Sequence, residues 1–419
     1  MKSIGIFWKE TTYKSNDNKD AAINNLSQHQ LLNKAKEDIV NQKSDIYSDK
    51  TFDLQINLWN TEIKRNGSYA PIKFQALDLG LVCPLTTKEI TFLFPFKVDA
   101  PDFQDLASVL AGDNDLLCTV FNESLANTAQ SDKDYNVIEC EKFKYIMYKL
   151  SNDNIEDIKY DSKSSITQFT IKIISDFSSK NLEAYRLFIR FRLRLRDLGF
   201  LAHKRKISND WLQSAFSSTY MFDIRINDVR ELSNKKRVIV TGENQFMMPA
   251  FSKVHFYYMA DSEETIENGS SMKIDSRLLE NDRWHTYLGE GLEFASDNIA
   301  HHWKKKSLQK MTLKEIDCSN PQKPNLRFEP QKQSFEDFTL FFKTEFSDIN
   351  RKRISLYLII VALLGAISSS FITTLFEGID LLDKSKTSYV GLMIGSFLTL
   401  TLIGLLYFCL TRKLKVSDK

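Results

Sequence analysis

Apolar and polar residues alternate along much of the first part of the chain. Between residues 51 and 59 the even positions, from Phe52 to Leu58, are apolar, whereas the odd positions before Trp59 are polar. This alternation is typical of a β-strand with one buried face. Similar patterns predict strands at residues 1–10, 71–81, 89–98, 137–150, 166–174, 184–196, 220–229, 237–241, 253–260 and 272–274. The dipeptides Asn66-Gly67 and Asn268-Gly269 predict hairpin turns.

Three stretches have the wider spacing of apolar residues that predicts helices. They cover residues 21–42, residues 103–127 with an interruption at Gly112, and residues 279–310, the longest of the three. Mostly strands with helices at the flanks predict an α+β fold with a large, mostly antiparallel sheet. The regular alternation of a doubly wound fold is missing. We expect this fold to form a body over residues 1–310.

The composition changes after the body. Residues 311–333 contain several prolines, from Pro321 to Pro330, and few apolar residues, which predicts a linker. Phenylalanines then recur at helical spacing between Phe335 and Phe346, which predicts an amphipathic connecting helix over residues 334–353. This helix would either lie in the membrane interface or pack on the body.

The strongest hydrophobic signal lies near the end of the sequence. Residues 354–376 and residues 389–410 contain no charged side chain, and each run matches the roughly 20 apolar residues that a helix needs to cross a bilayer. A helix satisfies its own backbone hydrogen bonds in lipid, so we predict a transmembrane hairpin over residues 354–410. A buried hairpin in a soluble protein is a weaker alternative, since core helices seldom run this long without a charge.

Basic residues on both sides of the hairpin predict its orientation. A basic cluster at residues 351–353 precedes the first run, and Arg412, Lys413 and Lys415 follow the second, whereas the loop between the runs is slightly acidic. By the positive-inside rule, both termini lie in the cytoplasm and the loop lies outside. We therefore expect a two-pass protein of the inner membrane, with a cytoplasmic body and a cytoplasmic tail at residues 411–419.

Small and polar residues follow one side of each predicted span. On the first span they recur every fourth position at Gly365, Ser369, Thr373 and Glu377. On the second span they form a ridge at Gly391, Gly395 and Thr399. Close packing of helices explains the ridge, because small residues favour it in lipid. A pore lining explains the hydroxyl-bearing stripe of the first span better than packing does.

Composition and motifs narrow the candidate functions. The formal net charge is only +2, so any attraction to nucleic acid or lipid must come from a local patch. The five cysteines are scattered without a Cys-x-x-Cys pair, as expected for reduced thiols in a reducing compartment. The first residues lack the apolar region of a signal peptide, which fits a cytoplasmic N-terminus.

Motifs of catalysis are missing from the sequence. It contains no phosphate-binding loop, no nucleophile elbow and no His-Glu-x-x-His motif, so we expect neither an enzyme nor a cofactor. His301 and His302 would point apart on the predicted helix, because adjacent helical residues do not face each other. Without further ligands at metal spacing, no metal site is expected.

One predicted strand carries the candidate binding residues. The odd positions from Leu187 to Leu195 are apolar, so on a strand they would pack on the core while arginines at even positions line the other face. Side chains on one face lie roughly 6.6–6.8 Å apart, near the spacing of phosphates in an extended single strand. With a following basic cluster, the predicted phosphate ligands are Arg186, Arg190, Arg192, Arg194, Arg196, Lys204, Arg205 and Lys206. The alternative is a solvated face whose arginines pair with acidic residues of neighbouring strands.

The domain order, the C-terminal hairpin and the arginine-rich strand resemble the transmembrane effectors of bacterial anti-phage defence, and most of all the effector of the Hailong system. In that family a partner nucleotidyltransferase makes a DNA oligomer, which holds the effector closed until infection removes it. The resemblance therefore implies a nucleotide or oligonucleotide ligand on Arg190, Arg192, Arg194 and Arg196.

The sequence leads to one functional hypothesis and an alternative. A cytoplasmic sensor that binds a nucleotide or single-stranded oligonucleotide would gate a pore that depolarises or permeabilises the inner membrane, in anti-phage defence. Two helices cannot enclose a channel, so the pore requires a homo-oligomer, for which a tetramer is one arrangement. The alternative is a membrane-anchored scaffold or signalling receptor without a channel, and a membrane-bound enzyme ranks third.

Overall fold

The computed structural model describes residues 3–10, 50–65, 70–121, 125–131, 133–140, 143–156, 158–174, 177, 185–205, 217–232, 246–289, 291–315 and 326–347, with 357, 359, 360, 363–365 and 367. The chain divides into two compact units. The first comprises Met1–Lys206 and Thr219–Phe346, and the second comprises Ile207–Ser218 and Ser347–Lys419. Most described residues belong to the first unit, which contains the sheets below.

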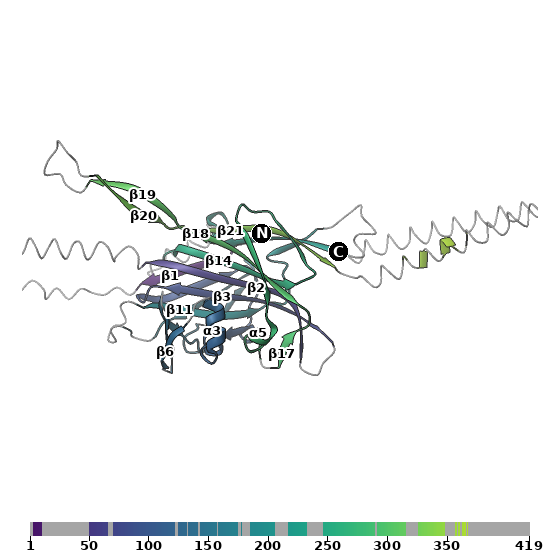
Figure 1. The fold of residues 1–419 in the computed structure, drawn as a ribbon, viewed down its shortest axis with the longest axis horizontal. Helices are drawn as coiled ribbons and strands as arrows, with labels where there is room; N and C mark the ends of the chain where they lie inside the picture. Colours follow the sequence, from purple (N-terminus) through teal and green to yellow (C-terminus); the bar gives the residue numbers. More distant parts are fainter. Residues whose placement is uncertain are drawn as a thin grey trace, which may run out of the picture. The chain divides into compact units, whose positions relative to one another are not determined.

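Eleven strands form the central sheet, in the order β16-β18-β14-β2-β3-β11-β8-β7-β6, with β17 added to β2 and β5 to β11 (Figure 1). Their bounds are β2 Thr51–Arg65, β3 Ile72–Cys83, β5 Phe103–Asp105, β6 Leu125–Ser131, β7 Tyr135–Cys140, β8 Lys144–Tyr148, β11 Arg186–Arg194, β14 Ala250–Asp261, β16 Ile274–Leu279, β17 Leu292–Phe294 and β18 Asn298–Lys306. Within this described sheet β14 pairs with β2 and β11 with β8 in parallel, and the other pairings are antiparallel.

Three smaller sheets and four short helices complete the described elements. One sheet has the order β1-β4-β10-β9, one has the order β12-β13-β21-β15, and the third pairs β19 with β20. The strand bounds are β1 Gly5–Glu10, β4 Thr87–Phe94, β9 Lys159–Asp161, β10 Ile166–Lys172, β12 Ala202–Lys204, β13 Ser217–Ile226, β15 Thr265–Asn268, β19 Leu308–Glu315, β20 Leu326–Gln333 and β21 Phe338–Ser347. The helices are η2 Ala100–Asp102, α2 Ala107–Ala111, α3 Asn114–Phe121 and α5 Asn281–Leu288.

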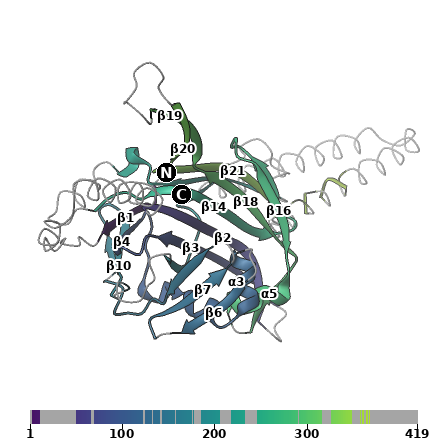
Figure 2. The same cartoon turned by 60° about the vertical axis from the view of Figure 1, so that its left-hand side comes forward.

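The two faces of the central sheet bury two different cores. Even residues of β2, such as Phe52 and Ile56, pack with side chains of β1, β4, β10, β13 and β21. On the opposite face Trp59 packs with side chains of α2, α3 and α5, and α3 and α5 both lie on that side in Figure 2. Alternation along a strand sends successive side chains to opposite faces, so both faces of this sheet are covered.

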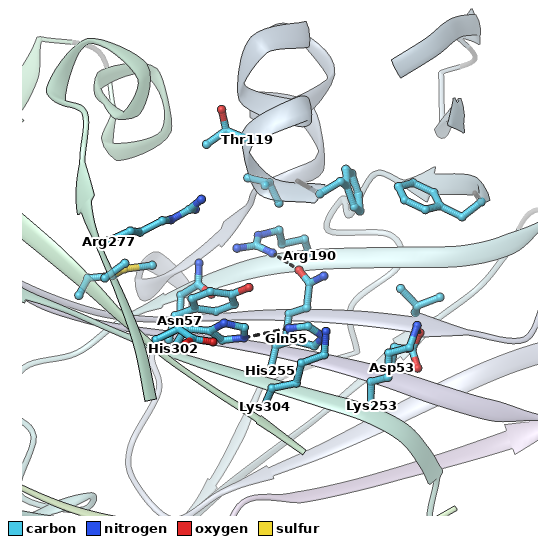
Figure 3. A pocket seen from close by; sticks show the side chains of 18 of the residues that line it. Asp53, Gln55, Asn57, Thr119, Arg190, Lys253, His255, Arg277, His302 and Lys304 are labelled. Atoms are coloured by element: carbon cyan, nitrogen blue, oxygen red, sulfur yellow. Dashed lines mark hydrogen bonds and ion pairs between the residues drawn. The ribbon is translucent and has the colours of Figure 1, made fainter. Parts of the chain in front are cut away.

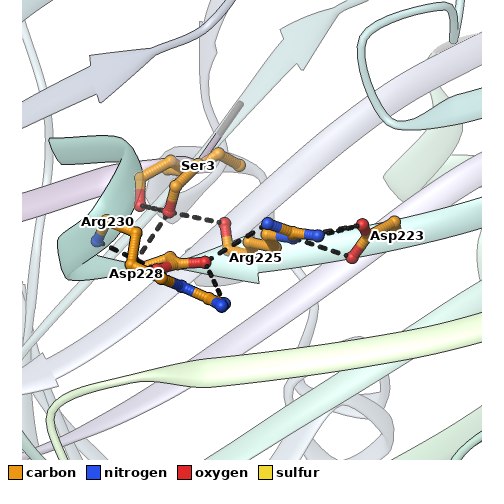
Figure 4. Close-up of polar contacts among 6 residues, drawn as sticks. Ser3, Asp223, Arg225, Asp228 and Arg230 are labelled. Carbon is orange, nitrogen blue, oxygen red and sulfur yellow. Dashed lines mark hydrogen bonds and ion pairs between the residues drawn. The ribbon is translucent and has the colours of Figure 1, made fainter. Parts of the chain in front are cut away.

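The first residues of the chain are attached to the end of β13. The backbone N–H of Ile4 donates to the carbonyl of Arg225 at 2.9 Å, and that of Asn227 donates to the carbonyl of Ile4 at 2.8 Å. Beside them, Ser3 Oγ accepts from the N–H of Asp228 at 3.0 Å, and Arg225 pairs with Asp223 at 2.7 Å (Figure 4). Residues more than 200 positions apart therefore close this part of the fold.

The structure confirms the sheet-rich α+β body. Strands β1, β2, β3, β4, β10, β11, β13 and β14 fall on the stretches that alternation predicts. Residues 137–150 form two strands, most of β7 and all of β8, instead of one. The predicted helix at 21–42, the strand at 237–241 and the turn at Asn66-Gly67 lie outside the described residues, although β2 and β3 on either side of that turn do pair antiparallel.

The predicted linker at residues 311–333 is wrong at residues 311–315 and 326–333, the part that the structure describes. β19 and β20 pair antiparallel from Leu308–Gln333 to Glu315–Leu326, and Pro330 lies opposite Met311. Proline is tolerated at such a position because each strand of a two-stranded sheet is an edge, where a missing N–H need not break the ladder. The prolines of this stretch therefore did not indicate a linker here, because a strand at the edge of a sheet also accepts them.

The predicted connecting helix at residues 334–353 is also wrong where the structure describes it. β21 occupies Phe338–Ser347 and lies between β13 and β15. Phe338 and Phe342 are four positions apart, a spacing that places residues on one face of a helix but also on one face of a strand. Leu340 between them is buried as well, and this period of two distinguishes the strand.

The long helix predicted at residues 279–310 is limited to α5. The chain turns after α5 at Gly289 and Gly291, whose φ angles of +134° and +72° favour glycine, and then forms β17, β18 and β19. Asn268-Gly269 does not join a hairpin, because β15 pairs with β21 and β16 pairs with β18.

None of the helices that the structure describes is long and apolar enough to cross a membrane. The predicted hairpin at 354–410 lies outside the described residues except at a few isolated positions.

Candidate functional site

A cavity of about 690 Å³ lies over one face of the central sheet. Side chains of β2, β11, β14, β16 and β18 form its floor, and Thr119 of α3 and Trp284 of α5 contribute to the opposite wall. Figure 3 shows Arg190 between the floor strands and the helix that carries Thr119. The cavity is thus built between the sheet and its covering helices.

One row of residues in register crosses five strands at the floor. Arg190 of β11 is opposite Gly80 of β3, which is opposite Gln55 of β2. His255 of β14 continues the row and Lys304 of β18 ends it. Partners in register point to the same face of a sheet, so this register places two cations and an imidazole in one cavity.

Gly80 leaves room for Arg190 to lie across β3. A Cβ atom at Gly80 would be 3.1 Å from Arg190 Nη1. Without it, Nη1 reaches β2 and donates to Gln55 Oε1 at 2.9 Å. A glycine inside a strand commonly marks such a close approach.

Arg190 is a buried cation whose hydrogen bonds go to neutral groups. The residue is 2% exposed. In addition to the bond from Nη1 to Gln55, the Nε of Arg190 donates to Tyr287 Oη at 2.8 Å. When the side-chain amide of Asn57 is turned, its oxygen accepts from Nη2 at 2.7 Å. Burial raises the pKa of the Tyr287 hydroxyl, which therefore stays neutral. Among the described residues no carboxylate is bonded directly to Arg190, although Tyr287 Oη, which accepts from it, donates in turn to Asp78 Oδ2 at 2.9 Å. Asp78 is already paired with Arg192, so Arg190 has no counter-ion of its own, an expensive state for a buried ion.

Arg192 shares that strand face but is fully paired. Its Nε and Nη2 donate to the two carboxylate oxygens of Asp78 at 2.7 and 3.0 Å, and both side chains are 0% exposed. Nη1 donates to the carbonyl of Tyr287 at 2.9 Å. Arg192 cannot bind a phosphate without breaking this pair, so the expectation that it belongs to an open row of phosphate ligands is wrong.

The other predicted basic ligands are spread over the molecule. Arg186 lines the cavity, where it bonds to the carbonyl of Thr51 and pairs with Asp53 at 3.4 Å. Arg194 and Arg196 are exposed outside the cavity lining, and Arg196 pairs with Asp99 at 2.6 Å. Lys204 and Arg205 are exposed in or beside β12, in another sheet, and Lys206 lies outside the described residues. Of the members of this set that the structure describes, only Arg186 and Arg190 lie in the cavity lining.

Four basic cavity residues were not among the predicted ligands. Together with the two arginines of β11, these give six basic lining residues and two acidic ones. The basic residues are Lys144, Arg186, Arg190, Lys253, Arg277 and Lys304, and the acidic residues are Asp53 and Asp275. Asp275 is already paired with Lys273 at 2.8 Å. Burial and, to a smaller extent, the neighbouring Lys306 and Lys253 lower the pKa of Lys304. The basic side chains of the lining outnumber its carboxylates. The cavity therefore favours an anion.

Two histidines meet in the same cavity. His255 Nδ1 and His302 Nε2 lie 3.0 Å apart, and the ring of His302 stacks on Tyr257 at 4.2 Å between centroids. Burial, together with the charge of Lys304, lowers the pKa of His255 to about 3 and that of His302 to about 4. Because β18 is a strand, His301 faces away from the cavity's pair and bonds to Ser276 instead. Among the described residues there is no cluster of three or more potential metal ligands.

Sequence signals for these residues exist but are short. Lys253, His255 and Tyr257 alternate with buried apolar residues, so the predicted strand at 253–260 already indicated a polar, basic face. His302 and Lys304 alternate with apolar residues in the same way, but the helix predicted at residues 279–310 hid this pattern.

The structure describes one of the predicted pore residues, Gly365, which lies in a helical turn. A Cβ atom added at Gly365 would have no other atom within 4 Å. The remaining predicted membrane residues, which lie outside the described part, are Ser369, Thr373, Glu377, Gly391, Gly395 and Thr399.

Comparison with known proteins finds no matching family model and no matching curated protein. The function proposed below therefore rests on the cavity and on the sequence pattern.

Proposed function

We propose that this protein is a membrane effector whose body binds a nucleotide or oligonucleotide in the cavity, and that this binding gates an oligomeric pore formed by residues 354–410. The observation that carries the proposal is that Arg190, which is 2% exposed in the cavity floor, has no carboxylate bonded to it among the described residues. A phosphate group bound near it would supply the missing negative charge and accept charge-assisted hydrogen bonds.

The shape and lining of the cavity support a ligand with rings as well as phosphates. Its volume of about 690 Å³ falls within the roughly 300–1,000 Å³ of small-molecule sites. The lining includes the aromatic side chains of Phe121, Phe143, Tyr145, Tyr257 and Trp284. Bases stack on such rings. A nucleotide combines the two chemistries that the cavity offers.

The membrane half of the proposal rests on the two uncharged runs and their basic flanks. β21 ends at Ser347, and only residues 348–353 separate it from the first run. The resemblance to the Hailong effector suggests how the halves work together. A partner nucleotidyltransferase would make the ligand, and its loss or arrival would change the pore. The effector would act in anti-phage defence at the inner membrane.

Mass spectrometry of molecules released from the purified full-length protein tests the ligand. The protein should be isolated in detergent and denatured, and the wild type is expected to release a phosphate-bearing nucleotide or oligonucleotide. Arg190→Gln should lose it, because the cavity then lacks its buried cation. Lys304→Gln, a change at an exposed residue, should weaken it without endangering the fold.

Arg196→Gln is the matched control, since Arg196 is on the same sequence stretch but outside the cavity lining. It should release as much ligand as the wild type. Loss of ligand in Arg196→Gln with retention in both cavity variants would place the site elsewhere. If the wild type releases no such compound and binds none when it is added at low salt, the proposed ligand class is wrong.

A further inference from the structure

The His255–His302 pair is arranged to hold an additional proton. Its facing nitrogens are 3.0 Å apart and the two rings are nearly parallel, at 10°. In the neutral pair one facing nitrogen carries the shared hydrogen and the other accepts it. One of the two outer nitrogens then still has a free lone pair. An added proton can bind there without breaking the shared hydrogen bond.

Charged groups from every neighbouring strand act on the pair. Its own strands carry Lys253 on β14, with Lys304 and Lys306 on β18, and β16 adds Arg277. The carboxylate of Asp275 on β16 acts in the opposite direction on His302. From β2 and β11 the cavity receives Asp53, Arg186 and Arg190, with Asp53 paired to Arg186 and Lys253 at 3.4 and 3.8 Å. The walls from α3 and α5 contribute the uncharged Thr119, Val120, Phe121 and Trp284.

Burial, assisted by this surplus of cations, keeps the imidazoles neutral while no anion is present. Burial lowers the pKa of both rings, and the neighbouring lysines lower it further. An anion between the lysines would reverse the second effect, because a nearby opposite charge favours the protonated imidazole. Binding and protonation would then assist each other.

We propose that His255 and His302, together with Lys253 and Lys304, form a phosphate subsite that takes up one proton when the anion binds. The four residues lie on the same two strands, with His255 opposite Lys304 in register, and Figure 3 shows them gathered at one part of the floor. The proton comes from solvent and binds the free outer nitrogen. Both outer nitrogens are then N–H donors, and the pair carries one positive charge.

The subsite rests on the proposed function, because it places a phosphate group of the ligand in the same cavity. It adds a property that the arginine alone cannot give. A guanidinium stays charged at all relevant pH values, whereas an imidazole pair changes its charge with the anion. The ligand's affinity therefore depends on pH at this end of the cavity.

Sulfate is a suitable probe, since it stays a dianion over the pH range in which histidine titrates. The full-length protein in detergent would be titrated with sulfate at constant ionic strength, at several pH values from about 5 to about 8, the range around the ordinary histidine pKa. Binding is followed by the shift of the thermal unfolding midpoint. The apparent affinity should increase as the pH falls, approaching tenfold per pH unit for one coupled proton.

The histidine variants separate this coupling from other titrations. The double variant His255→Gln/His302→Gln should still bind sulfate, more weakly and without the pH dependence, because glutamine keeps an amide but cannot titrate and no imidazole is left at the subsite. His203→Gln is the control, since His203 is exposed on β12 outside the cavity, and should behave as the wild type does. If sulfate binding by His203→Gln no longer depends on pH, or if the pH dependence persists in the double variant, the subsite is refuted.

A direct count of protons needs no variant. Mixing the wild type with sulfate in weakly buffered solution should raise the pH by an amount that corresponds to about one proton per bound anion. Sulfate binding with no proton uptake would refute the subsite and leave the proposed function intact. No sulfate effect at any pH, in the wild type and in Arg190→Gln alike, would instead refute anion binding in the cavity and the proposed function with it.

Discussion

Arg190 and Arg192 lie two positions apart on β11 and point to the same face, yet their charges are balanced differently. Asp78 is bonded to both Nε and Nη2 of Arg192, whereas Arg190 has only the neutral oxygens of Tyr287 and Gln55, with Asn57 after its amide is turned. Two buried cations thus share one carboxylate. The paired arginine stabilises the sheet and its helix cover, and the other one is available to compensate an anion.

Substitution of the two arginines should therefore have opposite consequences. Arg192→Gln is expected to lower the free energy of unfolding by about 3–5 kcal/mol, because it leaves the buried carboxylate of Asp78 without its partner. Arg190→Gln should cost much less in the ligand-free protein, because it removes a buried charge that lacks a counter-ion. Thermal and urea unfolding, followed by tryptophan fluorescence, measure both. An equal loss in the two variants would contradict this division of roles.

At the scale of elements, sequence patterns predicted where strands lie better than which elements cover them. Alternation correctly placed β11 and divided its faces, but the groups that enclose Arg192 come from distant segments, Asp78 at 114 positions and Tyr287 at 95. A single strand's pattern cannot reveal such partners. The row from Arg190 to Lys304 depends on the order of five strands, which no local pattern contains. The two wrong helices share another cause, since apolar spacings of four residues fit either structure.

Glu264 connects several elements on the opposite side of the sheet and should make stability depend on pH. Tyr258 of β14 donates to its carboxyl group at 2.7 Å, and Asn60 of β2 donates to Tyr258 at 2.9 Å. Burial raises the pKa of Glu264 from 4.5 to about 8. Between these values the unfolded chain has lost a proton that the folded protein still holds. Stability should therefore fall as the pH rises from about 4.5 to about 8 and change no further from this source.

Glu264→Gln should remove the fall in stability that comes from this carboxyl group, because glutamine has nearly the same size as glutamate and does not ionise. Thermal unfolding of both proteins across this pH window is the measurement. Glu267→Gln is a suitable control, since the carboxyl group of Glu267 is 70% exposed and paired with Lys343. A wild-type stability that stays level or increases over the window would exclude a buried, protonated Glu264.

At the scale of the whole molecule, the proposed function and its alternative differ in what residues 354–410 do: the proposed pore conducts ions, whereas the scaffold or receptor uses these residues only as an anchor. An anchor needs hydrophobic length, which Ser369→Leu and Thr373→Leu preserve. A pore wall needs hydroxyls that face water, and leucines there would narrow and dewet the path. The double variant is therefore expected to insert and oligomerise normally but to lose conductance in a planar bilayer. The recording must be made with and without ligand, and a silent wild type under both conditions favours the scaffold or receptor.

The pairing of β2 with β14 also has a consequence for biosynthesis. A hydrogen bond between Thr61 and Asp261 joins residues 200 positions apart, and at about 5–20 residues per second the ribosome needs roughly 10–40 s to make that interval. During this time β2 has an edge without its parallel neighbour, and such edges recruit other strands. Residues 348–376 follow almost at once when β21 is complete. The last strands of the body and the first uncharged run should therefore leave the ribosome together. Nascent chains arrested before Ala250 should be far more sensitive to protease than chains arrested after β21, and they are the form in which a chaperone has an open sheet edge to cover.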